Sequence, residues 1–328
     1  MSSKSALSLL ETEIAIKLIK DNFEKELAKA LKLTRVSAPL FVLPETGLND
    51  NLNGFERAVR FDVPDINAEV EIVQSLAKWK RNALAKYCFE DNTGLYTDMN
   101  AIRRDETLDA IHSVYVDQWD WEKIITSDER KLSYLKKTVK SIYKVVLKVA
   151  KLVNKQYPAI VHTLPKDITF ISTKQLEKMY PNEDRKQRER LAAKEFGAIF
   201  LYKIGWNLSD GKPHDGRAAD YDDWNLNGDI ILYYDVLDIP LEISSMGIRV
   251  DKVSLVKQLK KKGELSKMDN PYCKDILEDK LPLTIGGGIG QSRLCMFFLN
   301  KEHIGEVQAS VWPESQIQEY AKKGINLL

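Results

Sequence analysis

The sequence predicts an α+β protein in which helices flank an antiparallel β-sheet. Strand-like segments are interrupted by helical ones at irregular intervals, whereas a doubly wound α/β fold would need regular alternation. The chain has 328 residues, 44% of them hydrophobic, which is enough to bury a large core. No linker, repeat or low-complexity tract divides it. We therefore expect a single domain over 1–328.

The first part of the chain is predicted to begin with a long helix and continue into strands. Apolar residues recur at helical steps and indicate a helix over about 5–33. Strand and loop material follows to about 75, where a short helix begins near Ser75. Strands are then expected between Tyr96 and Trp121, on either side of a loop.

A lysine-lined helix is predicted between Lys131 and Lys155. Lysines recur there at steps of four on one face, and aliphatic residues fill the other face. Such a face allows a nucleic-acid track, but a solvated helix face is the ordinary explanation. Since the net charge of the chain is only +1, no overall positive field attracts RNA. We therefore expect no nucleic-acid partner.

The rest of the chain returns to strands. Strands are expected near 159–172, followed by one helix from 173 that Gly197 closes and by a strand over 198–205. Two strand-like segments occupy 228–250. A glycine turn over 284–290 then leads into a helix.

Cysteine usage and hydropathy favour a cytoplasmic protein. Cys88, Cys273 and Cys295 are widely spaced, so they predict neither a disulfide framework nor a zinc site. No apolar run reaches the roughly 18 residues that cross a bilayer. The N-terminus carries acidic residues where a signal peptide would be apolar. We therefore expect no membrane partner.

Charged residues gather around the last predicted strands and the glycine cluster. Asp229, Glu242 and Arg249 lie on the two strand-like segments, and Arg293 follows the glycines. Mg²⁺ prefers a few carboxylate oxygens and keeps its other positions for water and phosphate. An arginine behind a glycine turn can reach a phosphate or a base. This arrangement indicates a site for ATP and Mg²⁺, although a buried hairpin followed by a packed glycine turn is the plainer alternative.

These segments resemble the catalytic core of class II aminoacyl-tRNA synthetases. TIGGGIGQSRL (284–294) resembles the third motif of that family, and TRVSAPLFVLPETGLNDN (34–51), with Pro39, resembles the first. The stretch YTDMNAIRRDETLDAIHSVYVDQWDWE (96–122) resembles the second, and QSLAKWKR (74–81) resembles the segment that presents a substrate-binding lysine. The strings HSVYVDQWDWE, QSLAKWKR and LEISSMGIRV resemble, more narrowly, the ammonia-dependent asparagine synthetase family.

The resemblance implies a two-step reaction in a homodimer. ATP with Mg²⁺ and L-aspartate would give β-aspartyl-AMP and pyrophosphate, and ammonia would then displace AMP. Arg103 would bind the α-phosphate of ATP, and Arg293, Ser113 and Arg217 would also contact the nucleotide. Asp229 and Glu242 would hold Mg²⁺.

The resemblance also assigns residues to aspartate. Lys80 and Arg249 would hold its α-carboxylate, so that the β-carboxylate faces ATP. The string KWKR also fits an exposed basic turn. Ser75, Ser244 and Ser245 could instead hydrogen-bond to backbone groups. The other substrate-binding candidates are polar residues of the neighbouring segments: Ser75, Asp120, Asp222, Ser244 and Ser245.

The ammonia step is assigned to Asp50 and Gln118. Asp50 lies in a turn-rich loop just after the first motif, where a carboxylate normally caps backbone groups. The resemblance favours a functional role, because a carboxylate can bind ammonium and accept its proton.

Two other functions share these motifs. An aspartyl-tRNA synthetase-like enzyme would need an anticodon-binding domain, and only short segments flank the motifs here. A non-catalytic binding module would be expected to have lost the charged residues, which are all present.

Overall fold

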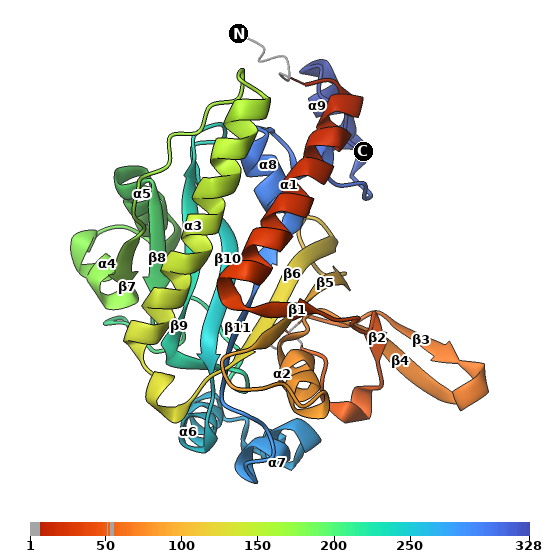
Figure 1. Cartoon of the computed structure of the whole chain (residues 1–328), viewed down its shortest axis with the longest axis vertical. Helices are drawn as coiled ribbons and strands as arrows, with labels where there is room; N and C mark the ends of the chain where they lie inside the picture. The colour runs from red at the N-terminus through yellow and green to blue at the C-terminus, as the bar shows by residue number, and fades with distance from the viewer. Residues whose placement is uncertain (1–6, 51, 53–55) are drawn as a thin grey trace.

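The computed structural model describes residues 7–50, 52 and 56–328, and its centre is an eight-stranded β-sheet (Figure 1). The strands lie in the order β1-β5-β6-β11-β10-β9-β8-β7. Their bounds are β1 Leu33–Arg35, β5 Gly94–Ile102, β6 Tyr115–Ile124, β7 Thr169–Ser172, β8 Ala198–Tyr202, β9 Asp222–Tyr234, β10 Ile239–Arg249 and β11 Thr284–Gly290.

The middle of this sheet is antiparallel, as predicted. Every pair from β5 to β8 runs antiparallel, and the parallel pairs are β1 with β5 and β7 with β8 at the two edges. In the centre, Gly288 of β11 lies opposite Asp120 of β6 and Ser245 of β10. The second motif, the third motif and the segments over 228–250 are therefore neighbouring strands of one sheet.

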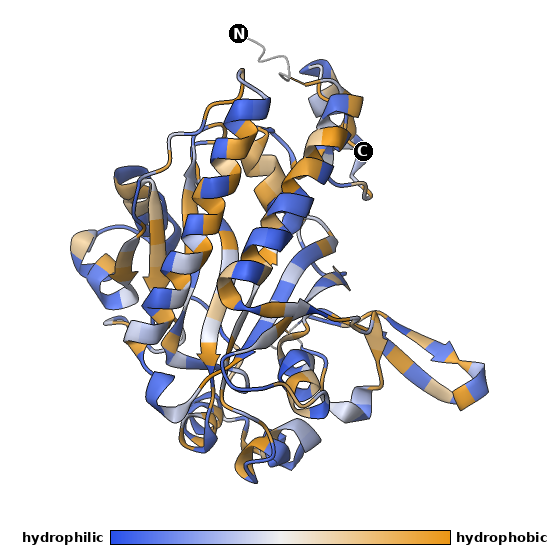
Figure 2. Ribbon diagram, viewed as in Figure 1, coloured by the Kyte–Doolittle hydropathy of each residue, from blue (hydrophilic) through white to orange (hydrophobic). Residues whose placement is uncertain are grey.

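Helices α1 (Leu9–Leu31), α3 (Leu132–Gln156) and α8 (Gln291–Phe298) cover one face of the sheet. Ser8 caps the start of α1 through a capping box with Glu11, which places the beginning of the helix predicted over about 5–33. The aliphatic side of α3 is buried, and the hydrophilic residues of α1 and α3 face outwards (Figure 2). The lysine face of α3 is thus largely a solvated helix face.

On the other face, the described helices cover the two ends of the sheet. Helices α4 (Thr173–Met179) and α5 (Arg185–Phe196) pack on β7, β8 and β9, where Leu176 and Ala192 meet Ile199 and Ile231. Helix α2 (Ala77–Lys86) packs against β5 and β6. Between them, β6, β11 and β10 present their side chains to a cavity.

A three-stranded arm projects from the body of the molecule (Figure 1). Its order is β2-β4-β3, with β2 Phe41–Val42, β3 Arg60–Val63 and β4 Ala68–Ile72. The remaining helices are α6 Lys252–Lys262, α7 Pro271–Leu277 and α9 Glu314–Lys322.

Three predicted elements differ from the structure. The strand expected near 159–172 is only β7, four residues long. The helix expected from 173 to 197 is two helices, because Pro181 prevents α4 from continuing and Asp184 caps a new start. The glycine turn expected over 284–290 is strand β11, and its glycines have negative φ angles.

Within the described residues, no helix is both long and apolar enough to cross a membrane.

Candidate active site

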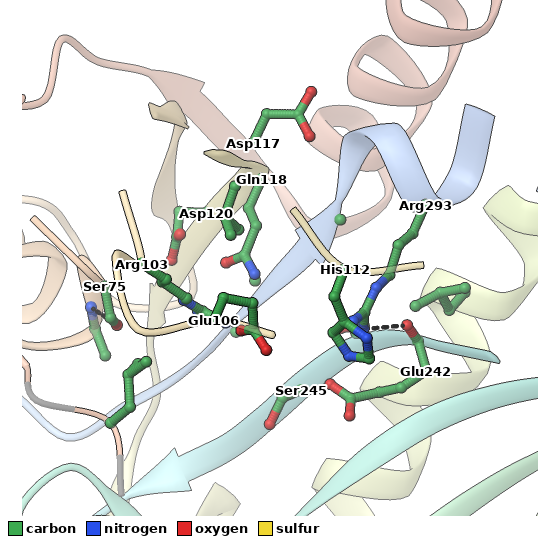
Figure 3. Close-up of a pocket in the computed structure, with 18 of the residues that line it drawn as sticks. Ser75, Arg103, Glu106, His112, Asp117, Gln118, Asp120, Glu242, Ser245 and Arg293 are labelled. Carbon is green, nitrogen blue, oxygen red and sulfur yellow. Dashed lines mark hydrogen bonds between the residues drawn. The ribbon is translucent and has the colours of Figure 1, made fainter. Parts of the chain in front are cut away.

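A polar cavity of about 400 Å³ opens on this face of the sheet, between the helices that cover its two ends. Figure 3 shows Gln118 and Asp120 on one strand, Arg103 and Glu106 on one side, and Arg293 with His112 and Glu242 on the other. All of these residues line the cavity. Segments far apart in the sequence therefore meet at one site.

The glycines of β11 make room for the side chains of its neighbours. A Cβ at Gly286 would overlap the Glu122 carboxylate and lie 2.7 Å from the Arg249 guanidinium. A Cβ at Gly288 would overlap the amide oxygen of Gln118. Strand β11 thus needs glycine for space, not for a special backbone angle.

Gly286→Ala is expected to lower the free energy of unfolding by about 1–3 kcal/mol, the usual cost of overpacking. The added methyl group would push Glu122 away from Arg249 in a fully buried position. Chemical denaturation measures the loss. Gly290→Ala is the matched control, because its Cβ would meet only the Arg293 side chain at 3.4 Å. Equal stability of the two variants would contradict this account.

Two buried basic residues form ion pairs beneath the cavity. The Lys80 ammonium pairs with Asp120 and donates to the carbonyl of Gly287 at 3.0 Å. The Arg249 guanidinium donates to Glu122 at 2.9 and 2.6 Å and also pairs with Asp222. Burial lowers the pKa of Lys80, although Asp120 opposes this shift.

This ion-pair layer leaves polar atoms without partners. One carboxylate oxygen of Asp120 and the hydroxyl of Ser244 are buried and have no hydrogen-bond partner among the described residues. Both residues line the cavity. Unsatisfied buried groups are costly in a folded protein. The open Asp120 oxygen and the Ser244 hydroxyl line the cavity together with Lys80 and Arg249, and such a set of groups can bind the ammonium and carboxylate of an amino acid.

Arg103 and Arg293 lie at the same cavity but are held differently. Arg103 donates to the carbonyl of Gln74 at 3.5 Å, and its buried Nε has no partner among the described residues. Arg293 comes from the first turn of α8 and donates to the carbonyl of Glu242 at 3.0 Å. Neither guanidinium forms an ion pair with a described carboxylate, so both are suited to bind an anion.

The remaining predicted residues of the cavity are small or amide side chains. Ser75, Ser113, Gln118 and Ser245 line it. The Ser113 hydroxyl hydrogen-bonds to that of Ser310 at 2.9 Å, and the Ser75 hydroxyl accepts from the backbone N–H of Ala77 at 3.2 Å. The two tryptophans of β6 instead point into the core, where Trp119 stacks on Phe23.

Arg217, Asp229 and Glu242 form a second charged group, in which Arg217 and Glu242 line the cavity and Asp229 does not. Arg217 pairs with Asp229 and Asp215. Burial raises the pKa of Asp229 to about 8, against the opposing effect of Arg217 and with a further increase from Glu242. One oxygen of Asp229 is buried without a partner among the described residues, whereas Glu242 is exposed.

Asp229 and Glu242 fit the needs of Mg²⁺. The ion commonly uses one or two carboxylates and takes its other ligands from water and phosphate. No group of three or more candidate ligand side chains occurs in the part of the chain that the structure describes. The open oxygen of Asp229 next to Glu242 matches such a two-carboxylate set.

Asp50 does not line this cavity, but borders a second one beside it. It is buried, and one of its oxygens accepts from the backbone N–H of Leu52 at 3.1 Å. The other oxygen has no partner among the described residues. Burial raises the pKa of Asp50 to about 6, against the effect of nearby Lys78.

Sequence reasoning missed several site residues. Glu122 fixes Arg249, and its position two residues beyond Asp120 on the same strand face was a usable signal. His112 lines the cavity and hydrogen-bonds to Asp109 at 2.8 Å. Lys78 pairs with Asp220 at 2.7 Å below Asp50. No sequence spacing indicates that last pair.

Comparisons with solved structures identify the fold. An asparaginyl-tRNA synthetase from Entamoeba histolytica, solved with asparaginyl-adenylate, superposes with a TM-score of 0.65 at 15% identity. The match covers 92% of this chain and 66% of that synthetase, so this chain spans just under two thirds of its length. The Pyrococcus horikoshii asparaginyl-tRNA synthetase with asparaginyl-adenylate superposes with a TM-score of 0.66 at 16% identity. That match covers 92% of this chain and 70% of the synthetase. The fold is that of the class II aminoacyl-tRNA synthetases.

Sequence relatives identify the family. A protein of Fusobacterium nucleatum named aspartate–ammonia ligase is 58% identical over 328 residues, covering 100% of both chains. One of Clostridium perfringens with the same name is also 58% identical, over 99% of this chain and 97% of its own. The sequence profile described as "Aspartate-ammonia ligase" matches residues 10–324. The chain therefore belongs to the aspartate–ammonia ligase family.

Proposed function

We propose that the protein makes L-asparagine from L-aspartate and ammonia at the expense of ATP, through a β-aspartyl-adenylate, releasing AMP and pyrophosphate. The observation that carries the proposal is a cavity that combines anion-binding arginines with an amino-acid subsite, in a chain that matches this family over almost its whole length. A homodimer in the cytoplasm, without a nucleic-acid partner, completes the proposal.

Aspartate lies over the ion-pair layer. Lys80 and Arg249 hold the α-carboxylate, and the open oxygen of Asp120 accepts from the α-ammonium, with Asp222 fixing Arg249. Ser75, Ser244 and Ser245 supply hydroxyl groups around the substrate. This orientation directs the β-carboxylate away from the buried ion pairs, towards the arginines of the cavity.

Adenylation joins this β-carboxylate to the α-phosphate of ATP. Negative charge grows on the phosphate oxygens, and cations fixed in advance lower that barrier. Arg103 and Arg293 face the cavity from opposite sides and fill this role, while Arg217 and Ser113 bind elsewhere on the nucleotide. Asp229 and Glu242 would hold Mg²⁺, which neutralises phosphate charge when bound.

Amide formation follows on the same substrate. Ammonium gives one proton to the Asp50 carboxylate, and the nitrogen lone pair attacks the acyl carbon. The nitrogen loses its second proton to solvent water, and the bond from the acyl carbon to the AMP oxygen breaks with its electrons on AMP. Gln118 lines the same cavity, and its amide orients the incoming nitrogen.

The direct test is product analysis with purified protein. ATP and aspartate are expected to give AMP, pyrophosphate and asparagine when ammonium is present, and no asparagine when it is left out. Addition of tRNA should change neither the rate nor the products. ADP as the nucleotide product would contradict the acyl-adenylate, and aspartylation of tRNA would favour the synthetase-like alternative.

A further inference from the structure

A segment that follows the third motif forms part of the candidate active-site cavity. Ile304 and Gln308 of this segment line the cavity, and both are buried. The backbone N–H of Ile304 donates to the carbonyl of Ala110 at 2.8 Å, in the loop of the second motif. The Arg293 guanidinium donates to the carbonyl of the next residue, Ile111, at 3.4 Å. The segment therefore lies at the end of the cavity that carries Arg293 (Figure 3).

The orientation of the Gln308 amide is fixed by two neighbours. Its NH₂ group donates to the Asp117 carboxylate at 3.3 Å and to the Ser292 hydroxyl at 3.0 Å. An ionised carboxylate only accepts, and Asp117 pairs with the Lys20 ammonium at 3.1 Å. The Ser292 hydroxyl donates its own proton to Asp117 at 2.8 Å, so it accepts from Gln308. Both neighbours therefore need the amide nitrogen, and the amide oxygen of Gln308 faces away from them.

This amide oxygen is a buried acceptor without a donor. Gln308 is only 5% exposed, and its oxygen has no hydrogen-bond partner among the described residues. Such a group is costly in a folded protein until a donor reaches it. Because Gln308 lines the cavity, a bound ligand can supply that donor.

Three apolar side chains accompany Gln308 at this end of the cavity. Ile111 and Ile304 line it from the two segments that meet there, and Val116 lines it next to Asp117, which holds Gln308. Ribose hydroxyls and phosphates need polar partners, whereas a flat aromatic ring can bury its faces against apolar side chains. The adenine ring of ATP combines such faces with an exocyclic amino group that donates at its edge.

We propose that Gln308 is a specificity-determining residue, which selects adenine by accepting a hydrogen bond from its exocyclic amino group. The inference rests on the proposed function, because it requires ATP in this cavity. Guanine has a carbonyl oxygen at the same ring position, and two acceptors that face each other repel. The amide of Gln308 can turn its NH₂ group towards that oxygen only by giving up its bonds to Asp117 and Ser292. The site therefore favours ATP over GTP.

The test compares ATP with purine ribonucleoside triphosphate, in which hydrogen replaces the exocyclic amino group. In aspartate-dependent pyrophosphate exchange, the unmodified protein is expected to show a kcat/KM about tenfold or more lower for this analogue, because the buried acceptor then stays unpaired. Gln308→Met keeps the length of the side chain and removes the acceptor. This variant should lose activity with ATP and should use ATP and the analogue equally well.

Gln316→Met is the matched control. The Gln316 amide donates to the carbonyl of Leu108 at 3.0 Å, in the same loop of the second motif, but Gln316 does not line the cavity. The control therefore loosens the loop and leaves the base contact in place. It should keep the preference of the unmodified protein for ATP over the analogue.

The outcomes separate this inference from the proposed function. Equal use of ATP and the analogue by the unmodified protein would overturn the base contact, and that measurement needs no variant to fold. An unchanged preference for ATP in Gln308→Met would overturn it too. So would a Gln308→Met variant that instead stops discriminating against ATP analogues lacking one ribose hydroxyl, because the contact would then be to the ribose. If the unmodified protein formed no asparagine with ATP, the proposed function itself would fail.

Discussion

Arg103→Ala and Arg293→Ala are each expected to lower kcat/KM for aspartyl-adenylate formation by about 30- to 1000-fold, which corresponds to roughly 2–4 kcal/mol of transition-state stabilisation. Both guanidinium groups face the cavity and are held by backbone carbonyls. Their positive charges are therefore fixed in place but not neutralised, as stabilisation of a growing phosphate charge requires.

Exchange of labelled pyrophosphate into ATP in the presence of aspartate measures this step without ammonium. Arg185→Ala is the matched control, because Arg185 pairs with Asp210 on the surface and does not line the cavity. The two site variants should also lose asparagine synthesis to the same extent, since no adenylate would be available to ammonia. Near-normal pyrophosphate exchange in both variants would show that these arginines contribute to packing and not to adenylate formation.

The sequence predicted the central sheet well because its patterns are local. On β6, for example, Gln118 and Asp120 line the cavity while Trp119, between them, packs on Phe23, as the two-residue period of a strand requires. The failed elements depend on single residues or on tertiary packing. Pro181 divides a periodic helical pattern, and the glycines of β11 look like a turn until neighbouring side chains show why they are needed.

The sequence predicted which residues form the site but not how their side chains pair with one another. The arginines and serines of the motifs line one cavity, as the resemblance to the class II synthetases implied. Their ion partners come from other segments, so that Glu122 holds Arg249 and Asp220 holds Lys78. Such pairs depend on which strands become neighbours, and one sequence does not give that information. The second cavity likewise exists only because the arm packs beside Asp50.

Asp50→Asn is expected to stabilise the protein while it impairs the chemistry. The pKa of Asp50 is about 6 in the folded state, above the ordinary value of 3.8. A raised carboxylate pKa means that the folded state loses stability as pH rises from about 4 to 6, and the full cost remains above that range. Removing the charge should therefore raise the free energy of unfolding at pH 7.5, by about 3 kcal/mol at most. Chemical denaturation should show a higher free energy of unfolding for Asp50→Asn than for the unmodified protein at pH 7.5, and this difference should disappear at pH 4.

The same substitution should separate the two half-reactions. Asp50→Asn keeps the shape of the side chain but removes the charge that attracts ammonium and accepts its proton. Pyrophosphate exchange should persist while asparagine synthesis falls by about 100-fold or more, within the range of general base catalysis. In the unmodified protein, the ammonia step should weaken as pH falls through about 6, where Asp50 becomes protonated, while exchange should not follow that titration.

Raising the pH supplies more free ammonia, which needs no base before it attacks. Higher pH should therefore partly restore synthesis in Asp50→Asn and leave Arg103→Ala unchanged, because the arginine variant lacks the adenylate itself. Equal loss of exchange and synthesis in Asp50→Asn would remove Asp50 from the ammonia step. It would then be a loop residue whose carboxylate caps the backbone N–H of Leu52.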